Sequence, residues 1–256
     1  MKKDTVYFIS DAHFGISISG QESREEHFSS FIQDISTSMS KLFIVGDLFD
    51  FWIEYKQAIR PDYFNVLYTL KQLTEKKIPV HYLAGNHDFA LGTFLKDYLG
   101  ITIHHGHYET VIQDKKVHLY HGDGLIKSDY GYRILRKILR NPVNQHIYKL
   151  LHPNIGVWFA TRCSGHSRKY LSGRISEKSV QEYRMHARKY LESGNDIAIF
   201  GHTHRAELCD LGCGIYCNTG SWLINYNYAS MRNGSISLWA YNCDSSSQKL
   251  PLTVCK

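Results

Sequence analysis

Five short motifs of potential metal ligands punctuate this 256-residue chain, and each follows a run of four or more mostly apolar residues. An apolar run of this length predicts a buried strand, so each motif lies where a strand emerges into a loop. α/β architectures place their functional side chains at such strand ends. The motifs are Asp11-Ala12-His13, Gly46-Asp47, Gly85-Asn86-His87-Asp88, His121-Gly122-Asp123 and Gly201-His202-Thr203-His204.

Apolar runs and amphipathic stretches alternate along the chain and predict an α/β fold. The patterns indicate helices over 24–38 and 62–76, and a hairpin turn at Asp114-Lys115. The order is βαβαβ as far as Tyr82 and strand-rich afterwards, which favours two sheets packed face to face with helices outside. We predict strands over 5–10, 42–45, 79–84, 102–104, 108–113, 116–120, 196–200, 215–218 and 235–241.

The residue types in the motifs suit a pair of divalent metal ions. Hydrolysis of a phosphate ester needs a strong nucleophile and neutralised phosphoryl charge, and two ions about 3.5–4 Å apart supply both. Such a pair needs a shared carboxylate, for which Asp47 is the candidate. Mixed histidine, carboxylate and amide ligands suit manganese, iron or zinc.

The spacing within the motifs predicts how the ligands are presented. In Asp11-x-His13 and His202-x-His204, side chains two residues apart would lie on the same side of an extended strand. A glycine precedes Asp47 and two other ligands, where it would let the backbone come close to the metals. Each motif alone occurs by chance in many chains, but five in one fixed order at strand ends do not.

Composition indicates a soluble globular protein, with 43% hydrophobic and 21% charged residues. The first apolar run is too short for a signal peptide, and no run approaches the length of a membrane-spanning helix. The six cysteines are sparse and do not resemble a disulfide framework, so we expect a reducing cytosol. Cys209, Cys213 and Cys217 could form a zinc site, but we interpret them as core residues of a strand-and-turn region.

Charge is concentrated in one segment. Residues 125–190 carry 14 Lys/Arg against 3 Asp/Glu, a net of +11, whereas the whole chain has +6 and the remainder therefore −5. The pattern is helical, with Ile134, Leu135, Ile138 and Leu139 on one apolar face. We predict a single domain over 1–256 in which 125–190 forms a basic helical insertion acting as a cap or lid.

The order and wording of the motifs resemble the signature of the calcineurin-like metallophosphoesterases, from Val6 to about Trp222. The resemblance implies a four-layer α/β/β/α sandwich and a dinuclear metal site. It implies that Asp11, His13, Asp47 and His204 hold one metal, and that Asp47, Asn86, His121 and His202 hold the other. It also implies that His87 contacts the phosphate and protonates or stabilises the leaving oxygen, and that Asp88 orients His87 by a hydrogen bond.

The wider wording is similar to that of the UDP-2,3-diacylglucosamine diphosphatases of lipid A synthesis. This similarity rests on Ser10 to Gly15, Gly46 to Trp52, the motif at His121, the run Asp129-Tyr130-Gly131-Tyr132, and the helical insertion. It implies attack of metal-bound hydroxide on the α-phosphorus of UDP-2,3-diacylglucosamine, giving UMP and 2,3-diacylglucosamine 1-phosphate. Two divalent ions, with Mn²⁺ as our choice, would be the cofactors.

The same similarity indicates substrate contacts in the basic segment. The implied residues are Asp129, Tyr132, Arg162, Ser164, Ser167, Arg168 and Lys169. A basic amphipathic segment beside a metal site could attract a diphosphate, receive acyl chains and contact an anionic membrane surface. We therefore expect a cytoplasmic protein with peripheral contact to the cytoplasmic face of the inner membrane, and the sequence indicates no protein partner.

One difference from the UDP-2,3-diacylglucosamine diphosphatases leaves other substrates as alternatives. Many of these diphosphatases have Arg after the metal-binding Asn, whereas this chain has His87, the form of the wider family. The alternatives are another nucleotide, sugar-phosphate or nucleic-acid phosphodiester substrate, or a non-catalytic binding scaffold. Nucleic acid is disfavoured because the basic segment lacks a recognisable Lys/Arg-aromatic platform. A scaffold is disfavoured because all seven ligands are present.

Overall fold

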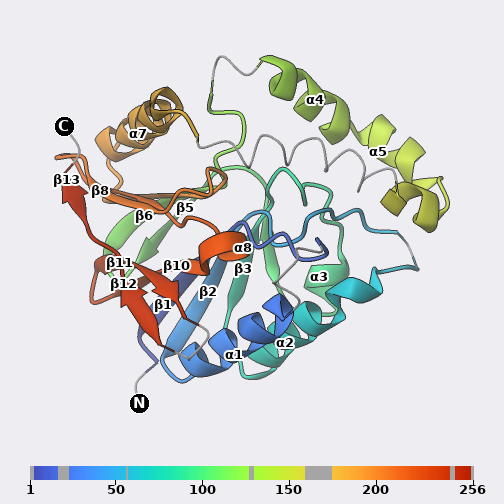
Figure 1. Cartoon of the computed structure of the whole chain (residues 1–256), viewed down its shortest axis with the longest axis horizontal. Helices are drawn as coiled ribbons and strands as arrows, with labels where there is room; N and C mark the ends of the chain where they lie inside the picture. The colour runs from blue at the N-terminus through green and yellow to red at the C-terminus, as the bar shows by residue number, and fades with distance from the viewer. Residues whose placement is uncertain are drawn as a thin grey trace.

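The computed structural model describes residues 3–16, 23–55, 57–126, 130–158, 175–242 and 246–254. Two sheets stand face to face (Figure 1). The first has seven strands, which lie across the sheet in the order β12 (Ser247–Lys249), β11 (Ser235–Tyr241), β10 (Asn227–Arg232), β1 (Thr5–Ile9), β2 (Met39–Val45), β3 (Val80–Leu83) and β4 (Thr102–His104).

The second sheet has six strands. They lie in the order β13 (Thr253–Val254), β8 (Glu207–Asp210), β9 (Ile215–Asn218), β7 (Ile197–Phe200), β6 (Lys115–Tyr120) and β5 (Tyr108–Ile112). The helical elements are α1 (Arg24–Ser36), η1 (Pro61–Tyr63), α2 (Phe64–Glu75), α3 (Phe94–Asp97), α4 (Tyr130–Arg140), α5 (Pro142–Lys149), α7 (Glu177–Glu192) and α8 (Trp222–Asn225).

Three buried clusters separate four layers. Phe28 and Phe31 of α1 pack with α2 against the outer face of the seven-stranded sheet. Phe8 of β1 and Ile199 of β7 belong to the core between the two sheets. Tyr183 of α7 packs on the outer face of the six-stranded sheet. The predicted four-layer α/β/β/α sandwich is therefore confirmed.

The topology brings the motif-bearing strands together at one edge of the sandwich. β1, β2 and β3 are parallel neighbours in the first sheet, and β6 and β7 are parallel neighbours in the second. Parallel neighbours end at the same edge of a sheet. All five motifs therefore emerge on the same side of the two facing sheets.

The nine predicted strands are all present, but four further strands escaped the pattern analysis. β8 and β12 are short, and β8 has an acidic residue at each end. β10 is a mixed polar and apolar run without alternation, although it is paired on both sides by β1 and β11. The hairpin turn lies at Gln113-Asp114, one residue earlier than predicted, because both residues adopt the positive φ that a two-residue turn requires.

The basic segment divides into two parts with different surroundings. α4, α5 and the helical residues 153–158 lie along one side of the molecule, apart from the sheets (Figure 1). α7, by contrast, buries Val180, Tyr183, Ala187 and Leu191, and so forms part of the outer layer of the sandwich. Among the described helices, none combines the length and the apolar character that crossing a bilayer requires.

The cysteine triplet is divided between the two faces of one sheet. Cys217 on β9 belongs to the core between the sheets, whereas Cys209 on β8 belongs to the cluster beneath α7. Side chains on opposite faces of a sheet cannot share one metal ion. Cys209 is also disulfide-bonded, which the sequence pattern did not indicate.

Candidate metal centre

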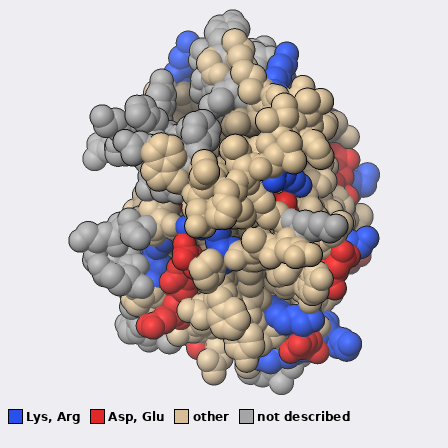
Figure 2. Space-filling view, turned by 90° about the vertical axis from the view of Figure 1, so that its right-hand side faces the viewer, with Lys and Arg blue, Asp and Glu red and all other residues tan. Residues whose placement is uncertain are grey.

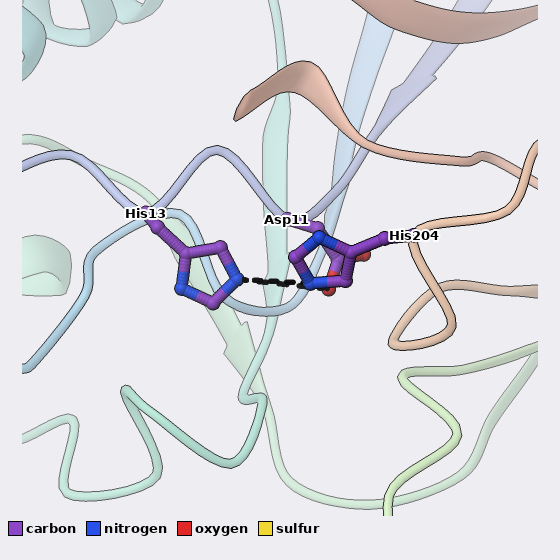
Figure 3. A group of neighbouring side chains, drawn as sticks. All are labelled: Asp11, His13 and His204. Atoms are coloured by element: carbon purple, nitrogen blue, oxygen red, sulfur yellow. Dashed lines mark hydrogen bonds and ion pairs between the residues drawn. The ribbon is translucent and has the colours of Figure 1, made fainter. Parts of the chain in front are cut away.

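Asp11, His13 and His204 form the first group of ligand atoms. Nε2 of His13 lies 3.2 Å from Nε2 of His204, and Nε2 of His204 lies 3.3 Å from Oδ1 of Asp11. The two rings point toward one another, with the Asp11 carboxylate beside the ring of His204 (Figure 3). The donor atoms of all three residues lie within 4.8 Å of one another, close enough to hold one ion.

Asn86, His121 and His202 form a second group. Nε2 of His121 lies 2.9 Å from Oδ1 of Asn86 and 3.2 Å from Nδ1 of His202. Asp47 lies between the groups: its Oδ2 is 3.2 Å from Nε2 of His121 and 3.9 Å from Nε2 of His13. The structure thus brings the seven predicted ligands together as two groups, with Asp47 in contact with both.

Neighbouring groups fix which atom of each ligand faces the centre. Oδ2 of Asp11 accepts hydrogen bonds from the Ser10 hydroxyl and, at 2.9 Å, from the His202 N–H. Oδ1 of Asp11 is buried and accepts no hydrogen bond within the described part of the chain. Nδ1 of His121 donates to the carbonyl oxygen of Val45 at 2.9 Å, so Nε2 is the ring atom that faces the centre. These residues therefore fit divalent ions.

The backbone at the ligands differs from the prediction. β1 ends at Ile9 and β7 ends at Phe200, before the paired ligands begin. Asp-x-His and His-x-His are therefore not segments of extended strand, and the prediction of an extended presentation is wrong. The left-handed region, rare for residues other than glycine, turns each side chain inward instead. Five ligands have this backbone, with φ values of 52° at Asp11, 46° at His13, 53° at Asp47, 69° at His202 and 56° at His204.

The glycines of the motifs make room for ligand side chains. A Cβ atom at Gly85 would lie 2.1 Å from Oδ1 of Asp47, and one at Gly46 would lie 2.3 Å from Nδ1 of His121. Both distances are far below any van der Waals contact. The glycines were expected to let the backbone approach the metals. Instead, the absence of a Cβ leaves room for a ligand side chain from another strand end, Asp47 at Gly85 and His121 at Gly46.

The electrostatics of the centre favour added positive charge. Burial alone would raise the pKa of Asp11, but the charges on His204 and His121 lower it to about 2. Burial alone would lower the pKa of His121, but the Asp47 carboxylate raises it to about 10. Buried carboxylates therefore stabilise a cation beside them, which is the environment that a divalent ion requires.

His87 lies at the centre, but Asp50 orients it rather than Asp88. Nδ1 of His87 donates to the carbonyl oxygen of Asp50 at 2.8 Å and lies 3.7 Å from that residue's Oδ1. The Asp88 carboxylate accepts instead from the N–H groups of Leu48 and Gly85, at 2.8 and 2.7 Å, and from the Tyr82 hydroxyl. Asp88 therefore connects the loop after β2 with the loop after β3. The expected hydrogen bond between Asp88 and His87 is not formed between these two described residues.

Asp123 is a further buried residue of the motifs, and no role was predicted for it. Its Oδ2 lies 2.8 Å from Nε of Arg136 and 2.9 Å from Nη2 of Arg140, both on α4. Arg140 also donates to the carbonyl oxygen of Gly85 at 3.1 Å. Two features of the sequence could have indicated this contact: the acidic residue directly after His121-Gly122, and two arginines four residues apart on a predicted helix.

An apolar cavity of about 430 Å³ lies beside the centre. Phe51 and Trp52 form one wall, directly after Asp50, and the N–H of Trp52 donates to the carbonyl oxygen of His87 at 3.1 Å. Val157 and Trp158, from the helical residues 153–158, line the same cavity. Phe49 and Trp52 are both buried in the core beneath the seven-stranded sheet, and Trp52 also borders this cavity together with Phe51.

The predicted substrate contacts lie mostly beyond the described structure. Tyr132 is on α4, but its side chain is not described. The other six lie outside the described residues: Asp129, Arg162, Ser164, Ser167, Arg168 and Lys169.

Comparison with known proteins gives the family. A model of the calcineurin-like phosphoesterases matches residues 5–206. A UDP-2,3-diacylglucosamine hydrolase from Porphyromonas gingivalis is 27% identical over 79% of this chain and 84% of its own length. The enzyme of the same name from Haemophilus influenzae is 27% identical over 86% of this chain and 91% of its own length.

Among solved structures, vacuolar protein sorting 29 from Cryptosporidium parvum aligns over 96% of this chain and 95% of its own, at 13% identity and a TM-score of 0.48. The match to the family model covers most of the sandwich and all five motifs. The chain therefore belongs to the calcineurin-like phosphoesterase family, and it is a metal-dependent hydrolase.

Proposed function

We propose that this protein hydrolyses the diphosphate of UDP-2,3-diacylglucosamine, giving UMP and 2,3-diacylglucosamine 1-phosphate. The observation that supports the proposal is the apolar cavity lined by Trp52, whose N–H donates to the carbonyl oxygen of His87, because such a cavity could receive an acyl chain near a centre suited to phosphoester hydrolysis. The names and coverage of the two relatives support the same substrate.

The seven ligands would hold two divalent ions, with Asp47 shared between them. When bound, the ions would neutralise the phosphoryl oxygens and activate a water molecule for attack on the α-phosphorus. The Asp50 carbonyl holds Nδ1 of His87, so Nε2 of His87 is the atom available to contact the phosphate or give a proton to the leaving oxygen. We propose Mn²⁺ as the metal, since the ligand set mixes imidazole, carboxylate and amide.

The cavity suits one end of the substrate and the centre suits the other. Phe51 and Trp158 offer aromatic surface to an acyl chain, and the two charged residues of the lining, Arg60 and Asp62, form an ion pair with each other. A diphosphate anchored at the metals could therefore place an acyl chain between the loop after β2 and residues 153–158.

We also propose peripheral contact with an anionic membrane surface. Large apolar side chains stand exposed along α4, α5 and the following turn, among them Ile134, Val143, Ile147 and Leu150. The end of the molecule that carries α5 presents an area with few charged side chains in its upper half, with Lys and Arg at its edge and some Asp and Glu on its right-hand side (Figure 2). Apolar residues bordered by cations are typical of surfaces that enter the lipid interface.

The test is incubation of purified protein and Mn²⁺ with UDP-2,3-diacylglucosamine and with its deacylated form. We expect faster UMP release from the acylated substrate, and ¹⁸O from labelled water in UMP rather than in the sugar phosphate. Equal rates on both substrates would contradict the lipid assignment, and ¹⁸O in the sugar phosphate would contradict attack at the α-phosphorus. A cosedimentation assay with anionic and neutral vesicles tests the membrane contact, which requires stronger binding to the anionic vesicles.

A further inference from the structure

Asp123 joins the helical segment to the loops of the metal centre. Its side chain is 1% exposed, whereas those of Arg136 and Arg140 are 29% and 30% exposed. Both guanidinium groups meet Oδ2 of Asp123, and Nη1 of Arg136 also donates to the Asp123 carbonyl oxygen at 3.2 Å. Arginines four residues apart lie on one face of a helix, so one face of α4 is directed at this single carboxylate.

The contact reaches loops from both sheets. Asp123 lies two residues after His121, at the end of β6 in the six-stranded sheet. Arg140 donates in addition to the carbonyl oxygen of Gly85, which lies directly before Asn86 at the end of β3 in the seven-stranded sheet. α4 is therefore attached to two ligand-bearing loops that approach each other from opposite sheets.

The chain leaves space for this contact. Gly124 has a φ of +78°, and a Cβ atom there would lie 2.6 Å from Nη1 of Arg136. The Asp123 carbonyl oxygen also accepts a hydrogen bond of 2.6 Å from the Tyr120 hydroxyl. The anchor point is therefore fixed by the sheet rather than by the helix.

The other end of the helical segment contacts the loop that forms the cavity. The rings of Phe51 and Tyr148 lie 5.9 Å apart, and the Tyr148 hydroxyl donates to the carbonyl oxygen of Gly156. Val157 and Trp158 also line the cavity. The helical segment therefore contacts the loops of the metal centre through α4 and the loop that lines the cavity through Tyr148 of α5.

We propose that Asp123 is a positioning residue that holds the helical segment against the metal centre through Arg136 and Arg140, and thereby sets the affinity for a substrate long enough to reach the cavity. It does so without contacting the bond that is cleaved. The identity of the long substrate rests on the proposed function, but the anchoring of α4 does not.

The test compares Arg140→Gln with Lys137→Gln. Lys137 is an exposed cation on the same helix, so the two substitutions remove the same charge and differ in contact with Asp123. With UDP-2,3-diacylglucosamine and Mn²⁺, we expect Arg140→Gln to raise KM about tenfold with kcat nearly unchanged. Hydrolysis of bis(p-nitrophenyl) phosphate, which is too small to reach the cavity, should stay at the wild-type rate in both variants.

A second measurement needs no substrate. Hydrogen exchange of the α4 backbone amides should be faster in Arg140→Gln than in wild type or Lys137→Gln, and Arg140→Lys should restore part of both the protection and the KM. Unchanged exchange in Arg140→Gln would overturn the anchoring. Equal loss of activity on both substrates would overturn the positioning role. If wild type hydrolyses only the small diester while the exchange result holds, the assigned substrate is wrong and the anchor stands.

Discussion

The metal centre and the helical segment α4–α5 are built in opposite ways. Asp11 and His121 are buried and held by backbone groups at or just after the ends of central strands. The helical segment exposes its large apolar side chains and meets the centre through side-chain contacts to Asp123 and Gly85. On the proposed function, bond cleavage would depend on the sandwich itself, and the preference for a substrate would depend on the attached helical segment.

The largest effect should follow from Asp47→Ala. This change removes the carboxylate that lies between the two ligand groups, so we expect turnover to fall by more than about 100-fold, the upper range for losing a group that merely orients a ligand. Acylated and small substrates should lose activity equally, with little change in the melting temperature. Metal content by mass spectrometry and kcat on the folded variant are the measurements; near wild-type activity would remove the two-metal proposal.

Gly85→Ala should come next. The added Cβ would meet Oδ1 and the backbone nitrogen of Asp47, at 2.1 and 2.6 Å, so Asp47 must shift. We expect about 10- to 100-fold loss of kcat on both substrates, because a displaced ligand remains present but poorly oriented. Gly106→Ala is the control, because a Cβ at Gly106 meets nothing within 4 Å, while its φ of +79°, which Gly85 does not share, makes alanine more strained there than at Gly85. Equal losses in both variants would point to general destabilisation.

Ala58→Phe should distinguish the contribution of the apolar cavity from that of the metal centre. Ala58 lines the apolar cavity, so a larger ring there excludes part of an acyl chain. If two methylene groups of the acyl chain lose their contacts, the binding free energy becomes about 1.6 kcal/mol less favourable, and KM for the acylated substrate should rise roughly 15-fold. The deacylated substrate and bis(p-nitrophenyl) phosphate serve as controls and should be unaffected. A parallel rise in KM for all three would show that the cavity and the centre are not separate.

The smallest effect concerns the pH dependence of stability at His81. Burial, together with the charges on Lys41 and His104, lowers the pKa of this side chain from 6.5 to about 4. Between about pH 6.5 and 4, the unfolded chain therefore binds a proton at His81 that the folded chain does not. The free energy of unfolding is unaffected by His81 above about pH 6.5 and decreases as the pH falls toward 4. His81→Gln should reduce the drop in melting temperature between pH 7 and 5 by about 2 °C. An unchanged drop would contradict this assignment.

The sequence predicted much of the sandwich and the membership of the centre, because both depend on local patterns. Apolar runs mark buried strands, and parallel strands carry their carboxyl ends to one edge. It did not predict that Asp50 rather than Asp88 holds His87, since that depends on how two loops cross. β10 was missed because its burial comes from its neighbours and not from its own composition. The role of Asp123 likewise depends on a helix distant in sequence.

The left-handed backbone at Asp11, Asp47 and three histidine ligands has a consequence for how such centres can change. The residue at each of these positions must meet two requirements: it must offer a metal-ligating atom, and it must adopt a left-handed backbone conformation that β-branched side chains disfavour. Asparagine tolerates that shape and offers an amide oxygen. Exchange of aspartate for asparagine is therefore the cheapest route by which a lineage could weaken metal affinity at Asp11 or Asp47 while retaining the fold.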